Sequence, residues 1–199
     1  MKGIVPALTP IAVCGFKGSG KNTVCSLLDK ILRRKWYDTQ TVAFANPIKE
    51  VVCDAFNLIS DEEYDLFKRS EFNILNRTVE GRHLLRSFGM LMRHYDDMQF
   101  IKYVEQRIRM YPNKITLISD LRFTNEIDWC IMNKIPIIKV ISDDTEADGH
   151  VSEVGIPDKY CTFIIDNNGT LRELEEKVSK VVETIFEERR NEKNEARNV

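Results

Sequence analysis

The chain has 199 residues, of which 43% are hydrophobic and 30% are charged, and its formal net charge is −2. This length suits one domain with a substantial core. The charge balance gives no basic excess for binding nucleic acid or an anionic membrane, so we expect neither partner. No window approaches the ~18 consecutive apolar residues of a membrane span, and residues 1–10 show no secretory signal, which predicts a cytoplasmic protein.

The cysteines indicate free thiols. There are five, an odd number, and none forms a C-x-x-C pair. Each lies in an apolar run, which predicts buried thiols in a reducing compartment. The three histidines show no zinc-ligand spacing.

The first readable element is a strand followed by a Gly-rich loop. Residues 11–14 form a short apolar run, and Gly15, Gly18 and Gly20 precede a helical pattern. Glycines permit a backbone path that turns N–H groups inward, which suits phosphate oxygens. The start of the helix adds the positive end of its dipole. The alternative is a Gly-rich turn without a ligand.

The residues that follow favour phosphate binding. The pattern G-x-x-x-x-G-K fits a P-loop, with Lys21 for the β- and γ-phosphates and a Thr23 hydroxyl near the metal position. Asn22 stands where the general motif has Ser or Thr. Spaced as G-x-x-G-x-G-K-x-T, the loop is similar to that of nucleoside monophosphate kinases.

The rest of the chain alternates between short apolar runs and helical periodicity. Strands are predicted at residues 11–14, 41–45, 115–119, 135–141 and 161–165, with helical faces within 24–32, 48–56, 84–95, 100–108, 126–132 and 171–186. Asn46 is the expected cap of the second helix, and Pro47 lies in its first turn. Residues 58–79 show no dominant period. The alternation predicts an α/β three-layer fold with a mostly parallel five-stranded sheet.

Polar features fall at the carboxyl ends of these strands, where ligands bind in such sheets. They are the Gly-rich loop, Asn46-Pro47, Asp120 and an acidic loop at residues 142–159. For Asp120 the alternative is a helix cap or turn former.

Three arginines share one face of the helix predicted after Gly81. Arg82, Arg86, Gly89 and Arg93 stand at i, i+4, i+7 and i+11. Guanidinium groups grip phosphate oxygens bidentately. The alternative is a solvated basic face.

Together these motifs resemble the bacteriophage deoxynucleoside monophosphate kinases. The matching pieces are Gly15–Thr23, Phe44–Lys49, Gly81–Arg86 with Gly89, Ser119–Glu126 and His150–Glu153. Of these, S-D-L-R-F-x-N-E is the most specific. Three residues depart from the family pattern: Asn22 replaces Asp, Arg86 replaces Gln, and Met90 replaces Thr.

The resemblance implies transfer of the ATP γ-phosphoryl group to a deoxynucleoside 5′-monophosphate, with Mg²⁺. It implies one P-loop kinase domain at residues 1–188, with an NMP-binding lobe at 46–112, a lid at 142–159 and a charged tail at 189–199. The ATP-binding residues would be Gly15, Lys17, Gly18, Ser19, Gly20, Lys21, Asn22 and Thr23. The acceptor would be bound by Lys49, Arg82, Arg86, Gly89 and Arg93. The catalytic residues would be Lys21, Asp120, Arg122 and Glu126, with Thr23 and Asp120 on the metal side.

Several roles stay open at this point. Arg122 is an in-cis arginine finger or an ion-pair partner of Glu126 at i+4. Lys17 and Lys49 are ligands or ordinary surface lysines. Phe100 is a candidate base contact, whereas Trp36 and Trp129 are expected in the core. Residues 187–199, which are highly charged and poor in apolar side chains, are expected to be frayed or disordered.

Two other functions remain. One is a kinase for a different small acceptor, such as dephospho-coenzyme A, and the other is a module that binds ATP without catalysis. Asn22 favours the latter because it removes a Ser/Thr metal ligand. In each case the partners are small-molecule nucleotides, and the sequence is compatible with a homodimer.

Overall fold

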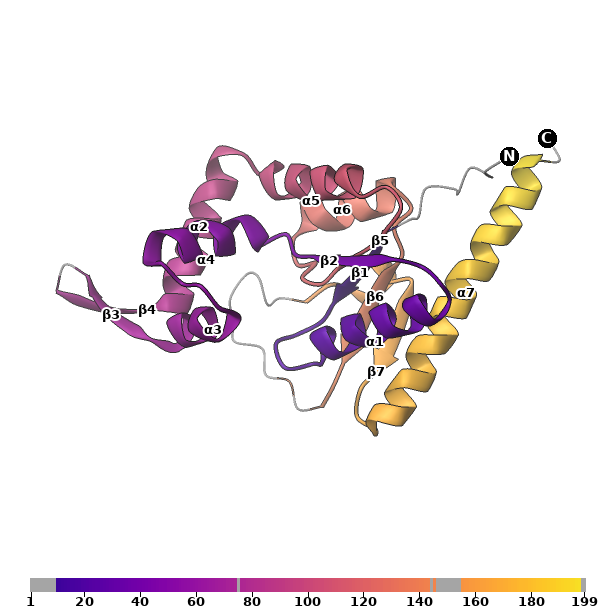
Figure 1. The fold of residues 1–199 in the computed structure, drawn as a ribbon, viewed down its shortest axis with the longest axis horizontal. Helices are drawn as coiled ribbons and strands as arrows, with labels where there is room; N and C mark the ends of the chain where they lie inside the picture. Colours follow the sequence, from indigo (N-terminus) through magenta and orange to yellow (C-terminus); the bar gives the residue numbers. More distant parts are fainter. Residues whose placement is uncertain (1–9, 75, 144, 146–154, 198–199) are drawn as a thin grey trace. The chain divides into compact units, whose positions relative to one another are not determined.

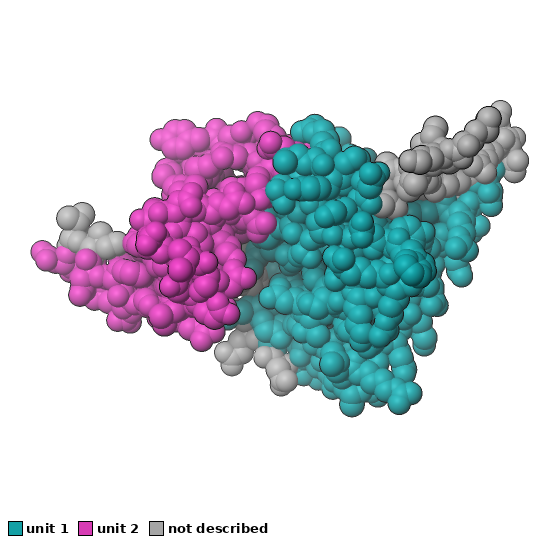
Figure 2. Space-filling view, in the orientation of Figure 1, with its two compact units in different colours: residues 1–43, 107–199 teal, residues 44–106 magenta. Residues whose placement is uncertain are grey.

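The computed structural model describes residues 10–74, 76–143, 145 and 155–197. The described chain forms two compact units, residues 1–43 with 107–199 and residues 44–106, which Figure 2 colours separately. The second unit is therefore an insertion in the sequence of the first. Among the helices of the described ranges, none has the length and apolarity needed to cross a membrane.

The first unit is built on a five-stranded parallel sheet, as predicted. The strands are β1 (Ile11–Cys14), β2 (Thr39–Val42), β5 (Ile115–Ile118), β6 (Ile137–Ile141) and β7 (Phe163–Asp166), in the order β2-β5-β1-β6-β7. Every pairing is parallel. β2 begins two residues before its predicted start and ends at Val42, three residues before its predicted end. Its pairing ends where the Val42 carbonyl accepts from the Ser119 N–H at 3.1 Å.

Helices cover the two faces of this sheet (Figure 1). Helices α1 (Lys21–Arg34) and α7 (Leu171–Arg197) share one apolar core with the strands. Ile11 and Val13 point into that core, so strand alternation directs Ala12 and Cys14 to the opposite face. Helix α6 (Thr124–Met132) buries Ile127, Trp129 and Cys130. The predicted three-layer α/β fold is confirmed.

Some local expectations for this unit differ from the structure. Trp36 is 96% exposed in a left-handed turn at φ 65°, whereas Trp129 is buried as predicted. The expected disorder after Glu187 is wrong, because α7 continues as a helix to Arg197. Glu, Lys, Arg and Ala, which make up most of that segment, are good helix formers even without an apolar face.

The thiols divide into two groups. Cys14, Cys25 and Cys130 are buried, whereas Cys53 and Cys161 are only half-buried. All five are free, so the predicted burial holds for three of them.

The second unit contains helices and a hairpin. Its elements are α2 (Asn46–Phe56), α3 (Asp61–Arg69), β3 (Glu71–Ile74), β4 (Arg77–Glu80), α4 (Gly81–Tyr95) and the first part of α5 (Gln99–Met110). The strands β3 and β4 pair antiparallel. Residues 58–79, which showed no period, thus fold as α3 and this hairpin. The N-cap of α2 is Ala45 without a side-chain bond, so the predicted capping by Asn46 is wrong by one residue.

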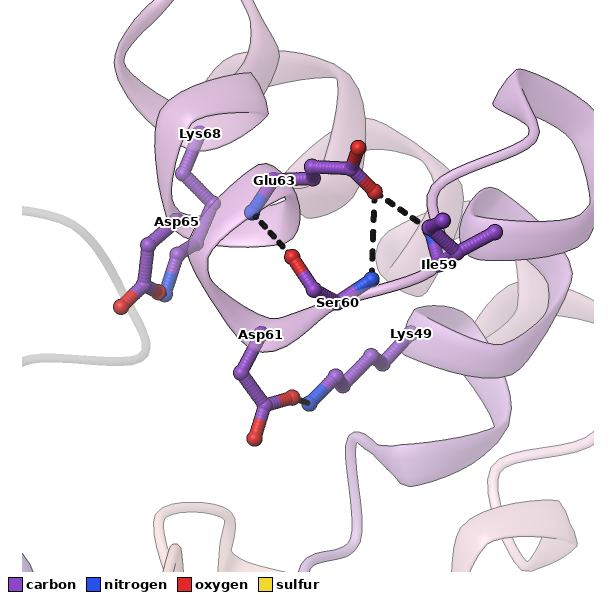
Figure 3. Close-up of polar contacts among 7 residues, drawn as sticks. All are labelled: Lys49, Ile59, Ser60, Asp61, Glu63, Asp65 and Lys68. Carbon is purple, nitrogen blue, oxygen red and sulfur yellow. Dashed lines mark hydrogen bonds and ion pairs between the residues drawn. The ribbon is translucent and has the colours of Figure 1, made fainter.

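Local signals start α3 and turn the hairpin. The Glu63 N–H donates to Ser60 Oγ, and Glu63 Oε2 accepts from the Ser60 N–H, each at 3.1 Å (Figure 3). This reciprocal pair is a capping box. Asn76 adopts φ 64° between the strands, a conformation that Asn tolerates.

Aromatic rings and tight backbone contacts hold this unit together. The rings of Phe56, Phe67 and Phe72 form a cluster with centroids 4.7 to 6.0 Å apart. The Gly81 N–H donates to the Ser70 carbonyl at 2.9 Å. A Cβ on Gly81 would overlap the Phe67 carbonyl oxygen, which explains why glycine starts α4.

Candidate functional site

The Gly-rich loop takes the backbone path that its glycines predict. Gly15, Gly18 and Gly20 have φ values of 145°, 84° and 92°. Side-chain-bearing residues resist this region. A Cβ on Gly15 would also overlap the Val140 carbonyl oxygen of β6. The glycine at that position therefore lets the loop leave β1 close against its neighbour.

Internal hydrogen bonds close the loop and start α1. The Phe16 carbonyl accepts from the Ser19 N–H at 3.2 Å and from Lys21 Nζ at 2.5 Å. The Gly20 carbonyl accepts from the Val24 N–H at 3.0 Å, which is the first bond of the helix. The predicted order of strand, loop and helix is thus present.

One loop side chain fits an anionic ligand well. Ser19 is completely buried, yet its Oγ has no hydrogen-bond partner among the described residues. A buried hydroxyl without a partner is unfavourable by about 1–3 kcal/mol. A phosphate oxygen bound in the loop would accept from this hydroxyl, so Ser19 is compatible with an anionic ligand. Of the other predicted ATP residues, Lys17, Gly18, Asn22 and Thr23 are exposed.

Asp120 lies where two strands of the sheet end. The residue before it donates to the Val42 carbonyl of β2, and the Leu121 N–H donates to the Val13 carbonyl of β1 at 3.3 Å. These bonds fix the backbone on both sides of a half-buried carboxylate. The placement agrees with the predicted position at the carboxyl end of a strand.

The charges of Lys21 and Asp120 both affect the pKa of the buried Cys25 thiol on α1. Burial and, to a smaller extent, the Asp120 carboxylate raise the pKa of Cys25 to about 12, against the opposing effect of the Lys21 ammonium. Lys21 follows the loop after β1 and Asp120 follows β5, the strand beside β1, so both residues lie at the carboxyl edge of the sheet.

Glu126 and Arg122 occupy different surroundings, although both were predicted catalytic. Glu126 is completely buried, and its Oε2 accepts from the backbone N–H groups of Arg122 at 2.9 Å and Phe123 at 3.1 Å. Glu126 therefore fixes the start of α6. The Arg122 side chain is exposed, as a residue that reaches a ligand would be.

In the second unit, Lys49 is held by an acidic and an aromatic residue. Its Nζ lies 2.5 Å from an Asp61 carboxylate oxygen, a pair that Figure 3 shows, and 5.0 Å from the Tyr64 ring centroid. A bound monophosphate would compete with Asp61 for this ammonium.

The arginine face of α4 is partly a packing face. Gly89 is buried, and a Cβ there would lie 2.9 Å from Ile48 Cδ1 of α2. Arg82 and Arg86 are half-buried on this helix. Arg93 stacks its guanidinium 4.4 Å from the Phe100 ring centroid. Because Phe100 is completely buried, the expected contact of this ring with a base is wrong.

The predicted lid is described only at its ends. His150, Ser152 and Glu153, the matched residues within 142–159, lie outside the described residues. Gly155, at φ 79°, lies against the loop, because a Cβ there would be 2.7 Å from Phe16 Cζ. A short 3-10 helix, η2 (Asp158–Tyr160), then leads to β7.

Sequence reasoning missed Asn167, which contacts the Gly-rich loop directly. Its Nδ2 donates to the Ser19 carbonyl at 2.9 Å. The sequence Asn167-Asn-Gly169 indicates only a turn. A contact across 148 positions leaves no local signal, so only the order of parallel strands would have found it.

Comparisons with known proteins agree with the predicted resemblance. Residues 90–178 match the family model described as deoxynucleotide monophosphate kinase. A deoxynucleotide monophosphate kinase from Escherichia phage RB69 is 26% identical over 120 residues, covering 57% of this chain and 49% of the relative. The chain thus matches about half the length of that relative.

Two solved structures are similar to this chain with lower sequence identity than the phage relative. A dephospho-CoA kinase from Campylobacter jejuni is 13% identical, with a TM-score of 0.48 over 88% of this chain and 96% of that one. A gluconokinase from Sinorhizobium meliloti 1021 is 11% identical, with a TM-score of 0.41 over 92% and 98%. Likeness at this level does not indicate an acceptor. The predicted resemblance to the deoxynucleoside monophosphate kinases is confirmed by the match of residues 90–178 to that family's model.

Proposed function

We propose that this protein transfers the γ-phosphoryl group of ATP to a deoxynucleoside 5′-monophosphate. The observation that carries the proposal is the Gly-rich loop with its left-handed glycines at the carboxyl end of β1, next to Asp120 at the carboxyl end of the neighbouring strand β5. The match of residues 90–178 to the deoxynucleotide monophosphate kinase model supports the choice of acceptor.

The donor half of the reaction needs positioning and neutralisation of charge more than covalent chemistry. Loop N–H groups and the Ser19 hydroxyl would bind phosphate oxygens. Lys21 would exchange the Phe16 carbonyl, which its Nζ contacts at 2.5 Å, for the anionic phosphates. Such preorganised donors commonly raise turnover by about 10²–10³-fold.

Thr23 and Asp120 are the residues that would hold Mg²⁺. This ion binds through few protein ligands and several phosphate oxygens, and when bound it neutralises charge on those oxygens. Thr23 is exposed in the first turn of α1, and Asp120 is half-buried at the end of β5. A hydroxyl and a carboxylate are the oxygen ligands that Mg²⁺ prefers.

The acceptor half would use the second unit. Arg82 and Arg86 on α4 and Lys49 on α2 offer cations to a monophosphate. Arg93 would contribute less, because its guanidinium stacks on Phe100. The exposed Arg122 would neutralise charge on the transferred group, whereas Glu126 would keep the Arg122 backbone in place.

A coupled ADP assay across all deoxy- and ribonucleoside monophosphates tests the proposal. We expect ADP formation that depends on Mg²⁺ and on one or more deoxynucleoside monophosphates. Equal ADP formation with and without an acceptor would contradict it. Dephospho-coenzyme A belongs in the panel as a different small acceptor.

A second candidate is a module that binds ATP without transferring phosphate. The exposed Asn22, next to Thr23 at the start of α1, favours it, because the amide supplies neither a hydroxyl nor a carboxylate. Tight ATP binding without turnover against the whole panel would support this candidate. The variant Asn22→Asp, which restores the family residue, should then leave turnover absent.

A further inference from the structure

Asn167, the first residue after β7, joins the end of the sheet to the Gly-rich loop. Its side-chain Nδ2 donates to the Ser19 carbonyl at 2.9 Å, and its backbone N–H donates to the Ile141 carbonyl of β6 at 2.9 Å. The same side-chain amide fills the space where a Cβ on Gly20 would lie. One residue thus contacts two successive positions of the loop.

The turn that carries Asn167 is itself braced on both sides. The Asn168 N–H donates to Asp166 Oδ1, and the Asp143 N–H donates to Asn168 Oδ1, each at 2.8 Å. Glu173 accepts from the Thr170 N–H at 2.7 Å at the start of α7. Asn167 therefore projects from a fixed turn, which is what a precise positioning group requires.

The hydrogen bond to Ser19 has a consequence for the next N–H group. A trans peptide is planar, so its C=O and N–H point in opposite directions. Because the Ser19 carbonyl points at Asn167, the N–H of Gly20 points away from Asn167. Gly20 lies at φ 92°, a region in which the peptide has freedom to rotate without such a restraint.

We propose that Asn167 is a positioning residue for the triphosphate: it fixes the Ser19–Gly20 peptide so that the Gly20 N–H is available to phosphate oxygens. The inference rests on the proposed function, because it assigns a support to the same donor site. Asn167 acts through the loop and touches no reacting atom. Its removal should therefore affect ligands that carry phosphates, whatever base they have.

The first test compares Asn167→Ala with Asn133→Ala. The control is matched, because Asn133 Nδ2 also donates to a backbone carbonyl, that of Trp129 at 2.8 Å, at the end of α6. Calorimetry would measure binding of ATP and of inorganic tripolyphosphate to each full-length protein. We expect Asn167→Ala to weaken both ligands by about three- to tenfold, the effect of one hydrogen bond. Asn133→Ala should leave both unchanged.

A second variant, Asn167→Asp, keeps the shape but cannot donate. Its carboxylate would face the Ser19 carbonyl, so we expect a loss of about tenfold or more for both ligands. In steady-state assays both Asn167 variants should raise the KM for ATP and leave the KM for the monophosphate unchanged. A purely structural defect would instead lower the melting temperature and affect both substrates equally.

Several outcomes overturn the inference. Unchanged tripolyphosphate binding with weakened ATP binding would mean that Asn167 contacts the nucleoside directly. Wild-type affinity for both ligands in Asn167→Ala would mean that the loop needs no support. In either case the proposed kinase would stand. If wild-type protein bound neither ATP nor tripolyphosphate, the proposed function and the inference would both fail.

Discussion

The two units support their proposed phosphate-binding residues with different amounts of packed structure. The Gly-rich loop follows β1, which like its neighbour β5 is buried along its whole length, and α1 and α7 share one apolar core with these strands. In the second unit, α4 carries its arginines with only Gly81 and Gly89 buried along its length. Apolar side chains such as Leu66, Leu91 and Tyr95 are largely exposed there.

The difference indicates that the proposed phosphate-binding residues of the first unit are held mainly by packed backbone, whereas those of the second unit are held by a few polar contacts. In the first unit the loop is positioned by the backbone of its glycines, by Asn167, and by the carboxyl ends of β1, β6 and β7. In the second unit Lys49 is positioned by Asp61 and Tyr64, which are contacts that a ligand can replace. Substitutions should therefore act on chemistry in the first unit and on affinity or local stability in the second.

The largest effect is expected for Lys21→Ala in the first unit. Loss of an electrostatic stabiliser should lower turnover by about 10²-fold or more. A phosphoryl-transfer assay at saturating substrates would measure it. The control is Lys30→Ala on the same helix, whose Nζ pairs with Glu175 at the surface and which should retain wild-type turnover. Near-wild-type turnover in Lys21→Ala would remove the phosphate-loop assignment.

In the second unit, Arg82→Ala should chiefly weaken the monophosphate. Losing a charge-assisted contact to phosphate corresponds to about a tenfold to hundredfold rise in the KM for the acceptor. The KM for ATP should hardly change. Arg69→Ala, on the exposed side of α3, serves as the control. An equal rise in the KM for both substrates would contradict the proposed role of α4 in binding the acceptor.

The two buried glycines of α4 should respond differently to alanine. Gly81→Ala places a Cβ against a backbone oxygen of Phe67, which cannot move freely, and should destabilise the protein by about 1–3 kcal/mol. Gly89→Ala meets only the tip of the Ile48 side chain, and alanine favours the helix by roughly 1 kcal/mol. Urea unfolding would measure both, and a larger loss for Gly89→Ala would contradict the packing described for α4.

The smallest effect concerns the core of the first unit at high pH. Burial raises the pKa of Cys130 to about 12, and the Glu126 carboxylate contributes in the same direction. Above about pH 8.5 the unfolded thiol ionises while the folded one stays protonated, so this stabilisation is lost as pH rises. Between about pH 8 and 10, wild type should lose about 2 kcal/mol more of its unfolding free energy than Cys130→Ala.

Urea unfolding at both pH values gives this difference. Each protein serves as its own reference, so the cavity left by alanine cancels. Parallel declines in the two proteins would mean that the thiol ionises in the folded state.

Much of the first unit could be predicted because its signals are local. Short apolar runs predicted the five strands, and glycines between a strand and a helix predicted the loop. The exposed Trp36 could not be predicted, because its left-handed turn follows from where α1 ends and not from its own hydrophobicity. Asn167 was missed because its partner is distant in the sequence.

The second unit was harder to predict for a physical reason. Its hairpin has no continuous apolar face, and the rings of Phe56, Phe67 and Phe72 come from three different elements. The Ser60–Glu63 capping box was the one readable local signal for α3. The arginine spacing on α4 was readable, but its overlap with the packing of Gly89 on Ile48 was not.

Glu126 shows how a genetic experiment on this protein would need to be interpreted. Its carboxylate is sealed from solvent and is shared by two backbone N–H groups beside Arg122. In a screen for loss of activity, substitutions at this position would score with those at Lys21 and Asp120. The Glu126 side chain would nevertheless act by holding the backbone of Arg122 in place. Loss of activity alone therefore cannot distinguish a positioning residue from a residue that contacts the substrate.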